Sequence, residues 1–179
     1  AIDFQIVTVN VIPVNDAPIT DNFIRTINED EFVEVNLDDY SSDVDMDALT
    51  YEIVYAGTNG ICTIDNNMII YTPNQDYPYT NKENGYDVCS YKANDGNLES
   101  NVSTFNIIIE PINDAPVTTE GTIETFEDTP ITFSLSDFTE DVENDPLTYQ
   151  LIDNAKSGDC INNFDGTFTY VPNNDFPFT

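Results

Sequence analysis

Carboxylate side chains recur in this sequence at a spacing that suits a hard metal ion. Residues 43–47 (DVDMD) place acidic groups at alternate positions, and residues 141–145 (DVEND) repeat the arrangement. Alternate side chains converge where a loop curls, and Ca²⁺ takes six to eight oxygen ligands at about 2.3–2.6 Å. Either segment alone is more simply explained as a polar turn. Because the arrangement occurs twice, the sequence favours calcium binding.

Paired carboxylates can also hydrolyse glycosidic bonds, with one acid as the proton donor and the other as the nucleophile or base. Two observations argue against catalysis. The acidic segments are duplicated along the chain, whereas an active site is seldom copied into every structural repeat. The 179 residues also contain no His, the commonest general base and the commonest ligand of transition metals. We therefore predict that the chain is not an enzyme and has no zinc site.

The charge balance excludes several classes of partner. The chain carries 34 acidic and 4 basic residues, a formal net charge of −30. Such a field repels nucleic acid and anionic membranes and attracts cations. No run of about 18 apolar residues is present, so we expect no membrane insertion. A solvated acidic surface that serves solubility alone is the alternative interpretation of the charge.

An internal repeat sets the expected domain organisation. Residues 13–18 (PVNDAP) recur 98 residues later as residues 111–116 (PINDAP), and the acidic segments and Cys62 and Cys160 share that spacing. We predict two linkers, one complete repeat, an incomplete second repeat without its last strands, and the last strand of a preceding repeat. The linkers are residues 13–18 and 111–116. The complete repeat covers residues 19–110, the incomplete repeat covers 117–179, and the last strand of the preceding repeat covers 1–12. Strand exchange between chains is the alternative account of the two open ends.

Short apolar segments between turn signals indicate strands throughout, and no segment keeps a helical apolar stripe. Residues 131–135 (ITFSL) alternate apolar and polar side chains, as do residues 33–37 (VEVNL). A repeat of about 98 residues with roughly seven such strands suits an immunoglobulin-like sandwich. Further strands are expected at 51–55, 68–71 and 88–91, and turns at 59–60, 84–85, 95–96 and 165–166.

The three cysteines fit the repeat. Cys62 and Cys89 fall in the complete repeat, and Cys160 is the copy of Cys62, with its own partner expected beyond Thr179. We predict a Cys62–Cys89 disulfide, which implies an oxidising environment outside the cell. Two buried free thiols are the alternative. The sequon at residues 101–103 (NVS) is a weak sign of glycosylation.

The linker residues are the next candidate ligands. Asn15 and Asp16, and likewise Asn113 and Asp114, stand between prolines that limit the freedom of the backbone. Their amide and carboxylate oxygens suit calcium, although Asn-Asp pairs also form simple turns.

The PVNDAP-type linker, together with residues 85–91 (GYDVCSY) and 94–96 (NDG), resembles the bacterial cadherin-like and immunoglobulin-like tandem repeats of large extracellular adhesins. The resemblance covers nearly the whole chain. It implies an all-β fold of tandem seven-strand, immunoglobulin-like (cadherin-like) β-sandwich repeats. It also implies an extracellular or cell-surface location, association with Ca²⁺ and a role as a stalk or contact in adhesion.

A more distant resemblance to true cadherins, which hold calcium between successive modules, implies the full ligand set. By that resemblance the ligands are Asn15, Asp16, Glu29, Asp43, Asp45, Asp95, Asn113, Asp114, Glu127, Asp141 and Glu143. An ion held by a linker, by Glu29 behind it and by Asp141 and Glu143 ahead of it would fix the angle between repeats. The linkers lack the acidic residue that cadherins carry before Asn-Asp, and Glu143 replaces an Asp.

The resulting hypothesis is a calcium-stiffened stalk or fibre of a large surface or secreted protein. Its expected partners are neighbouring repeats of the same chain, with other copies in a fibre or a surface ligand as further candidates. One alternative is a carbohydrate- or protein-binding module that uses Tyr77, Tyr79 and Tyr86. Phe176 and Phe178, the copies of Tyr77 and Tyr79, lack the hydroxyl, which favours packing over sugar binding. Another alternative is an accessory domain of a secreted enzyme.

Overall fold

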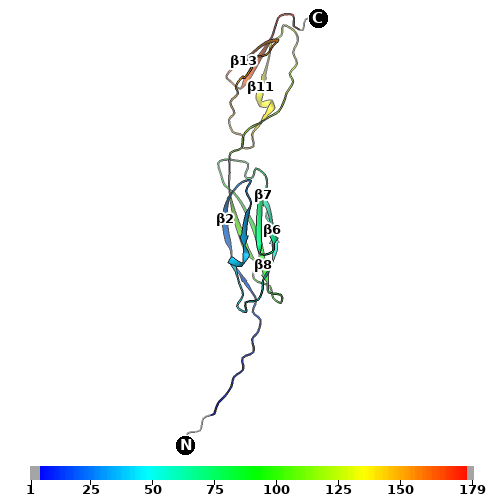
Figure 1. The fold of residues 1–179 in the computed structure, drawn as a ribbon. Helices are drawn as coiled ribbons and strands as arrows, with labels where there is room; N and C mark the ends of the chain where they lie inside the picture. Colours follow the sequence, from blue (N-terminus) through cyan, green and yellow to red (C-terminus); the bar gives the residue numbers. More distant parts are fainter. Residues whose placement is uncertain (1–4, 177–179) are drawn as a thin grey trace. The chain divides into compact units, whose positions relative to one another are not determined.

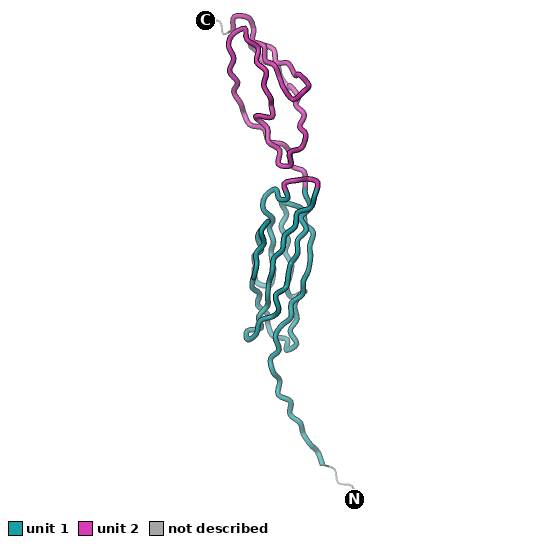
Figure 2. Tube along the Cα trace, turned by 180° about the vertical axis from the view of Figure 1, so that it is seen from behind, with its two compact units in different colours: residues 1–78, 83–111 teal, residues 79–82, 112–179 magenta. Residues whose placement is uncertain are grey.

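Two units make up the chain (Figure 2). A computed structural model describes residues 5–176; residues 1–4 and 177–179 lie outside the described residues. Unit 1 comprises residues 1–78 and 83–111, and unit 2 comprises residues 79–82 and 112–179. The short segment 79–82, between two strands of unit 1, thus groups with unit 2 (Figure 2).

Unit 1 is built from strands with one short 3₁₀ helix, in keeping with the short apolar segments of its sequence (Figure 1). Its elements are β1 (Ile19–Thr20), β2 (Phe23–Asn28), β3 (Val33–Asn36), η1 (Leu37–Tyr40), β4 (Ser41–Ser42), β5 (Thr50–Tyr55), β6 (Gly60–Asp65), β7 (Met68–Pro73), β8 (Gly85–Asn94) and β9 (Ser103–Glu110).

Two facing sheets form a sandwich in unit 1. One sheet has the order β2-β9-β8-β5, and the other has the order β3-β7-β6. All of these pairs are antiparallel except β2 with β9, which run parallel from Phe23↔Phe105 to Asn28↔Glu110. The two-residue strands β1 and β4 form a separate pair. Seven main strands therefore form an immunoglobulin-like sandwich.

Alternation along β9 explains how the core is filled. Phe105, Ile107 and Ile109 are buried, whereas Asn106 and Glu110 between and after them are exposed. These side chains meet Leu37 from η1, Ile69 and Tyr71 from β7 and Tyr91 from β8 in one apolar cluster. Since successive side chains of a strand point to opposite faces, the period-two pattern of the sequence is enough to assign the inner face.

A polar network closes one edge of this core. The Asp87 carboxylate accepts hydrogen bonds from Tyr71 Oη at 2.9 Å and from the backbone nitrogens of Thr58 and Asn59 at 3.0 Å. Burial and the Asp87 carboxylate raise the pKa of Tyr71, so its hydroxyl remains a donor. A side chain at Gly60 would collide with the Tyr71 hydroxyl. The turn at residues 56–60 is therefore held by one carboxylate.

The sequon asparagine is part of the fold. Asn101 accepts from the backbone nitrogen of Thr20 at 3.1 Å and donates to the Thr20 oxygen at 2.8 Å and to Ser103 Oγ at 2.9 Å. Ser103 is itself buried. Because both ends of the Asn101 amide join β1 to β9, these residues are explained as a structural clamp, which adds no support for glycosylation.

Unit 2 repeats part of this plan. Its elements are β10 (Val117–Thr118), β11 (Ile131–Ser134), η2 (Leu135–Phe138), β12 (Thr139–Glu140), β13 (Gly158–Asn162) and β14 (Thr167–Pro172). The sheet β11-β14-β13 corresponds to β3-β7-β6, and the pair β10-β12 corresponds to β1-β4. Residues 121–126 and 148–153, the counterparts of β2 and β5, form no strand. Their partners in unit 1 are β9 and β8, and positions 98 residues after those strands lie beyond Thr179.

Gly85 and the N-terminal segment differ from what their sequence patterns suggest. The Asn84-Gly85 pair was expected to form a turn, but Gly85 is the first residue of β8 and lies buried beneath the Tyr77 ring. A Gly is needed there for close packing rather than for turning. Residues 5–17 form no strand, and residues 5–14 are exposed. The assignment of residues 1–12 to a preceding repeat stays a prediction, and residues 1–4 lie outside the described residues.

The predicted disulfide is present. Cys62 on β6 and Cys89 on β8 are bonded across the two sheets, with a Cα–Cα distance of 6.3 Å and 27 residues of sequence separation. Both residues are buried in the core of unit 1. Cys160 in unit 2 is a free thiol.

Replacing both bonded cysteines by alanine should lower the free energy of unfolding of unit 1 by about 3 kcal/mol, because the open chain regains the entropy of a 27-residue loop. Urea denaturation followed by tyrosine fluorescence measures the loss. Cys160→Ala is the matched control and should leave the transition of unit 1 unchanged. An unchanged midpoint in the double variant would show that the disulfide does not stabilise the sandwich.

Candidate metal centre

Five of the predicted ligands of unit 1 lie together at the start of the unit. Asn15 Nδ2 donates to Asp95 Oδ2 at 2.9 Å, and the backbone nitrogen of Asp16 donates to Asp45 Oδ2 at 2.8 Å. The backbone nitrogen of Asp45 in turn donates to Asp43 Oδ1 at 2.9 Å. The linker, the loop after β4 and the turn after β8 are therefore joined through carboxylates. We call Asn15, Asp16, Asp43, Asp45 and Asp95 the unit 1 acidic group.

The loop after β4 owes its shape to Asp43. Its Oδ1 accepts hydrogen bonds from the backbone nitrogens of both Asp45 and Asp47, at 2.9 and 3.2 Å, as in an Asx turn. Met46 takes a positive φ of 64° at the bend. The second oxygen, Asp43 Oδ2, is buried and has no hydrogen-bond partner among the described residues. A buried carboxylate oxygen without a donor is costly, and a cation would satisfy it.

Asp95 is held in its ionised form. The backbone nitrogen of Leu98, the Asn15 amide and the backbone nitrogen of Asn97 all donate to its carboxylate, and they lower its pKa. Hydrogen bonds to the charged form stabilise it relative to the acid. Asp95 therefore offers an anionic carboxylate at neutral pH.

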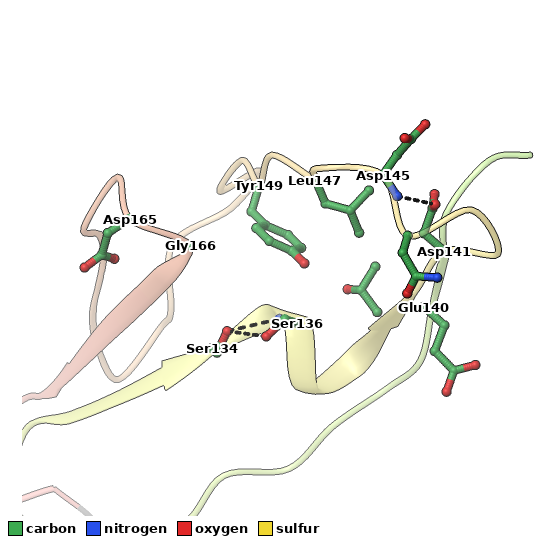
Figure 3. A pocket seen from close by; sticks show the side chains of 11 residues that line it. Ser134, Ser136, Glu140, Asp141, Asp145, Leu147, Tyr149, Asp165 and Gly166 are labelled. Atoms are coloured by element: carbon green, nitrogen blue, oxygen red, sulfur yellow. Dashed lines mark hydrogen bonds between the residues drawn. The ribbon is translucent and has the colours of Figure 1, made fainter. Parts of the chain in front are cut away.

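Unit 2 builds the same arrangement. The backbone nitrogen of Asp114 donates to Glu143 Oε1 at 3.1 Å, as Asp16 does to Asp45 in unit 1. The backbone nitrogen of Asp145 donates to Asp141 Oδ1 at 2.8 Å (Figure 3). Carboxylate oxygens of Asp114 and Glu143 lie within 4.8 Å of each other. We call Asn113, Asp114, Asp141, Glu143 and Asp145 the unit 2 acidic group.

An amide from a third segment joins the unit 2 group. Asn81 Nδ2 donates to Asp145 Oδ2 at 2.7 Å and to Asn113 Oδ1 at 3.3 Å. Nothing in the sequence singles out Asn81, because its counterpart in the second repeat would fall at or beyond the last residue. Asp145 is the third acid of the repeated loop at residues 141–145. The alternate spacing of the acids includes it, whereas the ligand set implied by the resemblance to cadherins does not.

An open pocket of about 640 Å³ lies beside the unit 2 loop, lined by η2, residues 139–149 and the turn at Asp165 and Gly166 (Figure 3). At the corresponding place in unit 1, the Asp38 carboxylate links two neighbouring segments. It accepts hydrogen bonds from Tyr51 Oη and Asn67 Nδ2, both at 2.8 Å. Burial raises the pKa of Tyr51 to about 12, which keeps its proton available for Asp38.

This link is missing in unit 2 because Ser136 and Gly166 replace Asp38 and Asn67. Unit 1 has a smaller pocket, of about 330 Å³, at the same place, and Asp38 and Asn67 are among the residues that line it. The larger pocket of unit 2 thus accompanies the loss of these two side chains, and Figure 3 shows Asp165 at the opposite end from Asp141 and Asp145.

A second acidic pair in each unit was not predicted. In unit 1, carboxylate oxygens of Asp30 and Asp76 lie within 4.8 Å of each other. In unit 2 the counterparts of Asp30 and Asp76 are Asp128 and Asp175. The backbone nitrogen of Asp175 donates to Asp128 Oδ1 at 3.1 Å. All four residues have φ between 55° and 62°, a left-handed backbone conformation that Asp tolerates. The signal was available, since both members of the pair recur in the repeat.

Glu29 and Glu127 do not join the acidic groups of their own units. Glu29 is buried next to the end of β9, where its backbone nitrogen donates to the Glu110 oxygen at 2.9 Å. The six-residue strand β2 separates it from the unit 1 acidic group. Glu127 is an exposed residue of a turn in unit 2. Their proposed role as ligands of a neighbouring repeat stays a prediction.

The aromatic residues weighed for sugar binding divide into two kinds. Tyr77 packs against the core of unit 1, and its hydroxyl accepts from Asn59 Nδ2 at 2.9 Å. Tyr79 and Tyr86 are exposed. Since Tyr77 is committed to packing, the three residues do not present a common aromatic surface.

A family model for the bacterial Ig domain matches residues 15–108 and again residues 113–179. The chain belongs to the bacterial Ig domain family. The predicted all-β sandwich repeats and the resemblance to bacterial Ig-like and cadherin-like repeats are thus confirmed. Bacterial Ig domains are typically non-catalytic and are commonly extracellular or on the cell surface. Among the described residues, no helix is long and apolar enough to cross a membrane.

Solved structures give weaker likenesses. An endo-fucoidan hydrolase of glycoside hydrolase family 107, MfFcnA4, aligns with 88% of this chain at 12% identity and a TM-score of 0.44. Extracellular cadherin domains 3–6 of protocadherin Gamma B2 align with 87% at 14% identity and a TM-score of 0.41. This bacterial Ig chain spans 24% of the hydrolase chain and 38% of the protocadherin chain. No curated protein matches the chain.

Replacing Asp95 by Asn in this bacterial Ig chain should destabilise unit 1 more at neutral than at acid pH. The pKa of Asp95 is lowered in the folded state, so its ionised form stabilises the fold above the unfolded pKa of about 3.9. That stabilisation is lost as the pH falls through the lower, folded pKa. Urea denaturation in chelator from pH 7 to pH 2 should show the difference between the two proteins shrinking below about pH 4.

Asp39→Asn, at an exposed position, is the control for loss of one negative charge. A difference between Asp95→Asn and the unsubstituted protein that stays constant down to pH 2 would contradict the assignment.

Proposed function

We propose that this bacterial Ig chain is a structural segment of an extracellular, surface-attached or secreted protein, in which Ca²⁺ stiffens a stalk or fibre used in adhesion. The ion would bind at the acidic group of each unit and hold the linker against the loop after it. The chain itself performs no catalysis in this proposal. Its partners are the neighbouring repeats of the same polypeptide.

One observation carries the proposal: in both units a carboxylate at the same position of the repeat accepts a hydrogen bond from the backbone of the linker. The backbone nitrogens of Asp16 and Asp114 donate to Asp45 and Glu143 at 2.8 and 3.1 Å. Unit 2 has the same arrangement, although its described residues form no four-stranded sheet like that of unit 1. It is therefore a local property of linker and loop, repeated with the sequence.

The chemistry of the group suits a hard divalent cation. The unit 1 acidic group offers four carboxylates and one amide, all oxygen ligands of the kind that Ca²⁺ selects. Asp43 Oδ2 and Glu143 Oε2 are buried without hydrogen-bond partners among the described residues. An ion would satisfy these oxygens and remove the repulsion between neighbouring carboxylates.

Stiffening follows from the shortness of the linker. In unit 2, the residues tied to the acidic group begin at Asn113, and β9 of unit 1 ends at Glu110. Only Pro111 and Ile112 then stand between a strand and a fixed linker, and the ring of Pro111 fixes its φ. An ion that holds Asn113 and Asp114 leaves few rotatable backbone bonds in the connection.

The sequence-based hypothesis that ions lie at the junctions of successive repeats needs acids at both ends of a unit. Unit 1 supports it, because Asp30 and Asp76 pair close to Glu29, while the unit 1 acidic group stands at its start. Asp128 and Asp175 repeat the pair in unit 2.

The decisive measurement is a thermal melt with isothermal titration of Ca²⁺ into chelator-stripped protein. Free calcium at about 100 times its dissociation constant should stabilise unit 1 by roughly 2.7 kcal/mol. Asp43→Asn combined with Asp45→Asn should abolish both the heat of binding and the stabilisation, since these substitutions remove two carboxylates and their charge.

Glu34→Gln combined with Asp39→Asn is the matched control, because it removes two exposed acids of unit 1 outside the acidic group. It should bind calcium as the unsubstituted protein does. If both double variants lose the calcium effect equally, or if NaCl of the same ionic strength reproduces it, calcium acts by general screening and the proposed role is wrong.

A further inference from the structure

The outer face of the four-stranded sheet of unit 1 carries an apolar patch. Because successive side chains of a strand point to opposite faces, the register of β2, β9 and β8 shows which outward side chains are neighbours. Two adjacent rows of outward side chains cross these strands: Ile24, Asn106 and Val88 in one row, and Thr26, Ile108 and Tyr86 in the next. We call the four apolar members, Ile24, Val88, Ile108 and Tyr86, the outer patch.

Solvent reaches the outer patch. Ile24 and Tyr86 are 54% and 64% exposed, and Val88 and Ile108 are half-buried. Together with polar residues of β9 and of the turn before β6, they line a shallow groove of about 510 Å³. Asp87 also lines this groove, but its carboxylate accepts hydrogen bonds from Tyr71 and from the backbone of residues 58–59. The floor of the groove is therefore apolar.

The repeat distinguishes the outer patch from the core. The inward positions of β9 are apolar in both copies, as Phe105, Ile107 and Ile109 and as Val7, Val9 and Val11. At the same spacing of 98 residues, the outward residues Ile24 and Ile108 correspond to Thr122 and Asn10, which are polar. An inward side chain fills the sandwich, whereas an outward one meets solvent, so folding explains the inward apolar residues and not the outward ones. Adjacent exposed apolar side chains of this kind mark an interaction surface.

Charge favours one class of partner for this surface. The outward positions of the two rows carry no ionised side chain, but the chain as a whole has a formal net charge of −30. A field of that sign attracts cationic partners and repels acidic ones, including a second copy of this chain. The nearest outward acid on β9 is Glu110, two residues after Ile108. An apolar floor in acidic surroundings complements a segment that has apolar side chains on one face and basic side chains beside them.

The side chains of the outer patch also favour a protein over a glycan. Three of its four members are aliphatic, and Tyr86 is its single aromatic residue. A site that orients a polar ligand places several polar groups around its apolar surface. Aliphatic side chains at the centre of a groove instead suit the apolar face of an amphipathic helix.

We propose that the outer patch binds the apolar face of a basic, amphipathic segment of a partner protein. Ile24, Val88 and Ile108 would cover the apolar side chains of the segment, and the ring of Tyr86 would pack beside them. Lysine or arginine side chains at the edge of the segment would lie in the negative field of unit 1. The contact uses no residue of the acidic groups, so it does not require calcium.

Fluorescence anisotropy with two labelled peptides tests the proposal on the full chain, in chelator and about 0.15 M NaCl, where long-range attraction is screened. The probe is a helical peptide of leucine and lysine whose leucines share one face. The control peptide has the same composition, with its leucines scattered around the helix. The amphipathic peptide should bind in the micromolar range, and the scattered peptide should bind about tenfold more weakly or less, because charge alone holds it.

Ile24→Thr combined with Ile108→Asn removes most of the patch with residues that the repeat itself has at these positions, and it leaves the net charge unchanged. It should weaken binding of the amphipathic peptide about tenfold. Val54→Asn combined with Ile61→Thr is the matched control, because both residues are exposed and lie outside the patch. This control should bind as the unsubstituted protein does. Circular dichroism checks that each variant is folded at the assay temperature.

Equal binding of the two peptides by the unsubstituted protein would show that charge alone attracts them. Unchanged binding by the Ile24→Thr, Ile108→Asn protein would place the contact elsewhere, and either result would overturn the proposal. Sedimentation velocity of the chain alone and titration with a neutral glucan oligosaccharide examine other occupants. Oligomers, or glucan binding, that this double variant abolishes would assign the outer patch to a second copy or to a glycan, and the proposal of a basic protein partner would be wrong.

Discussion

The double pairing of β9 is the interaction on which the sandwich depends. β9 lies between β2 and β8, so one strand satisfies the backbone of two neighbours and inserts three apolar side chains between the sheets. The described residues of unit 2 include no counterpart of β8 or β9, because positions 98 residues after those strands lie beyond Thr179. The three-stranded sheet β11-β14-β13 forms there, because its strands pair with one another. The counterparts of β2 and β5, whose partners in unit 1 are β9 and β8, form no strand among these residues.

Charge is the second constraint, and the fold resolves little of it internally. Of the four basic residues, Arg25 stacks on Phe23 and Tyr40 and donates to Tyr40 Oη at 2.7 Å. Lys92 pairs with Glu52 and Glu99 on the sheet surface. Exposed pairs of this kind contribute little to stability. Backbone N–H groups therefore hold the acidic loops in place, and the remaining negative charge is left for cations from the solvent.

Sequence alone predicted the parts of this fold that follow from periodicity and repetition. Alternation located β3 and β11. The repeat showed that Cys160 is the copy of Cys62, which left Cys62 and Cys89 as the two cysteines of one complete repeat and predicted their disulfide. Repetition located the two acidic loops, because Asp43 and Asp141 each accept a hydrogen bond from the backbone nitrogen four residues later. It could not give Asn81, whose contacts join segments far apart in the chain, nor the packing need of Gly85, which resembles a turn residue. Asp30 and Asp76 both recur, as Asp128 and Asp175, but their separation in the sequence hides the fact that they meet in the fold.

Ion binding at the unit 1 acidic group would also act on the chain before the linker. Asn15 and Asp16 are bound to that group through Asp95 and Asp45, and residues 5–12 stand immediately before them. An ion that fixes Asn15 and Asp16 would therefore also fix the base of the preceding segment. Pairing of that segment as a strand in the predicted preceding repeat would then cost less conformational entropy, because fewer backbone bonds remain to be ordered. Linkage requires the reverse effect as well: a segment held in a strand would raise the affinity of the acidic group for its ion.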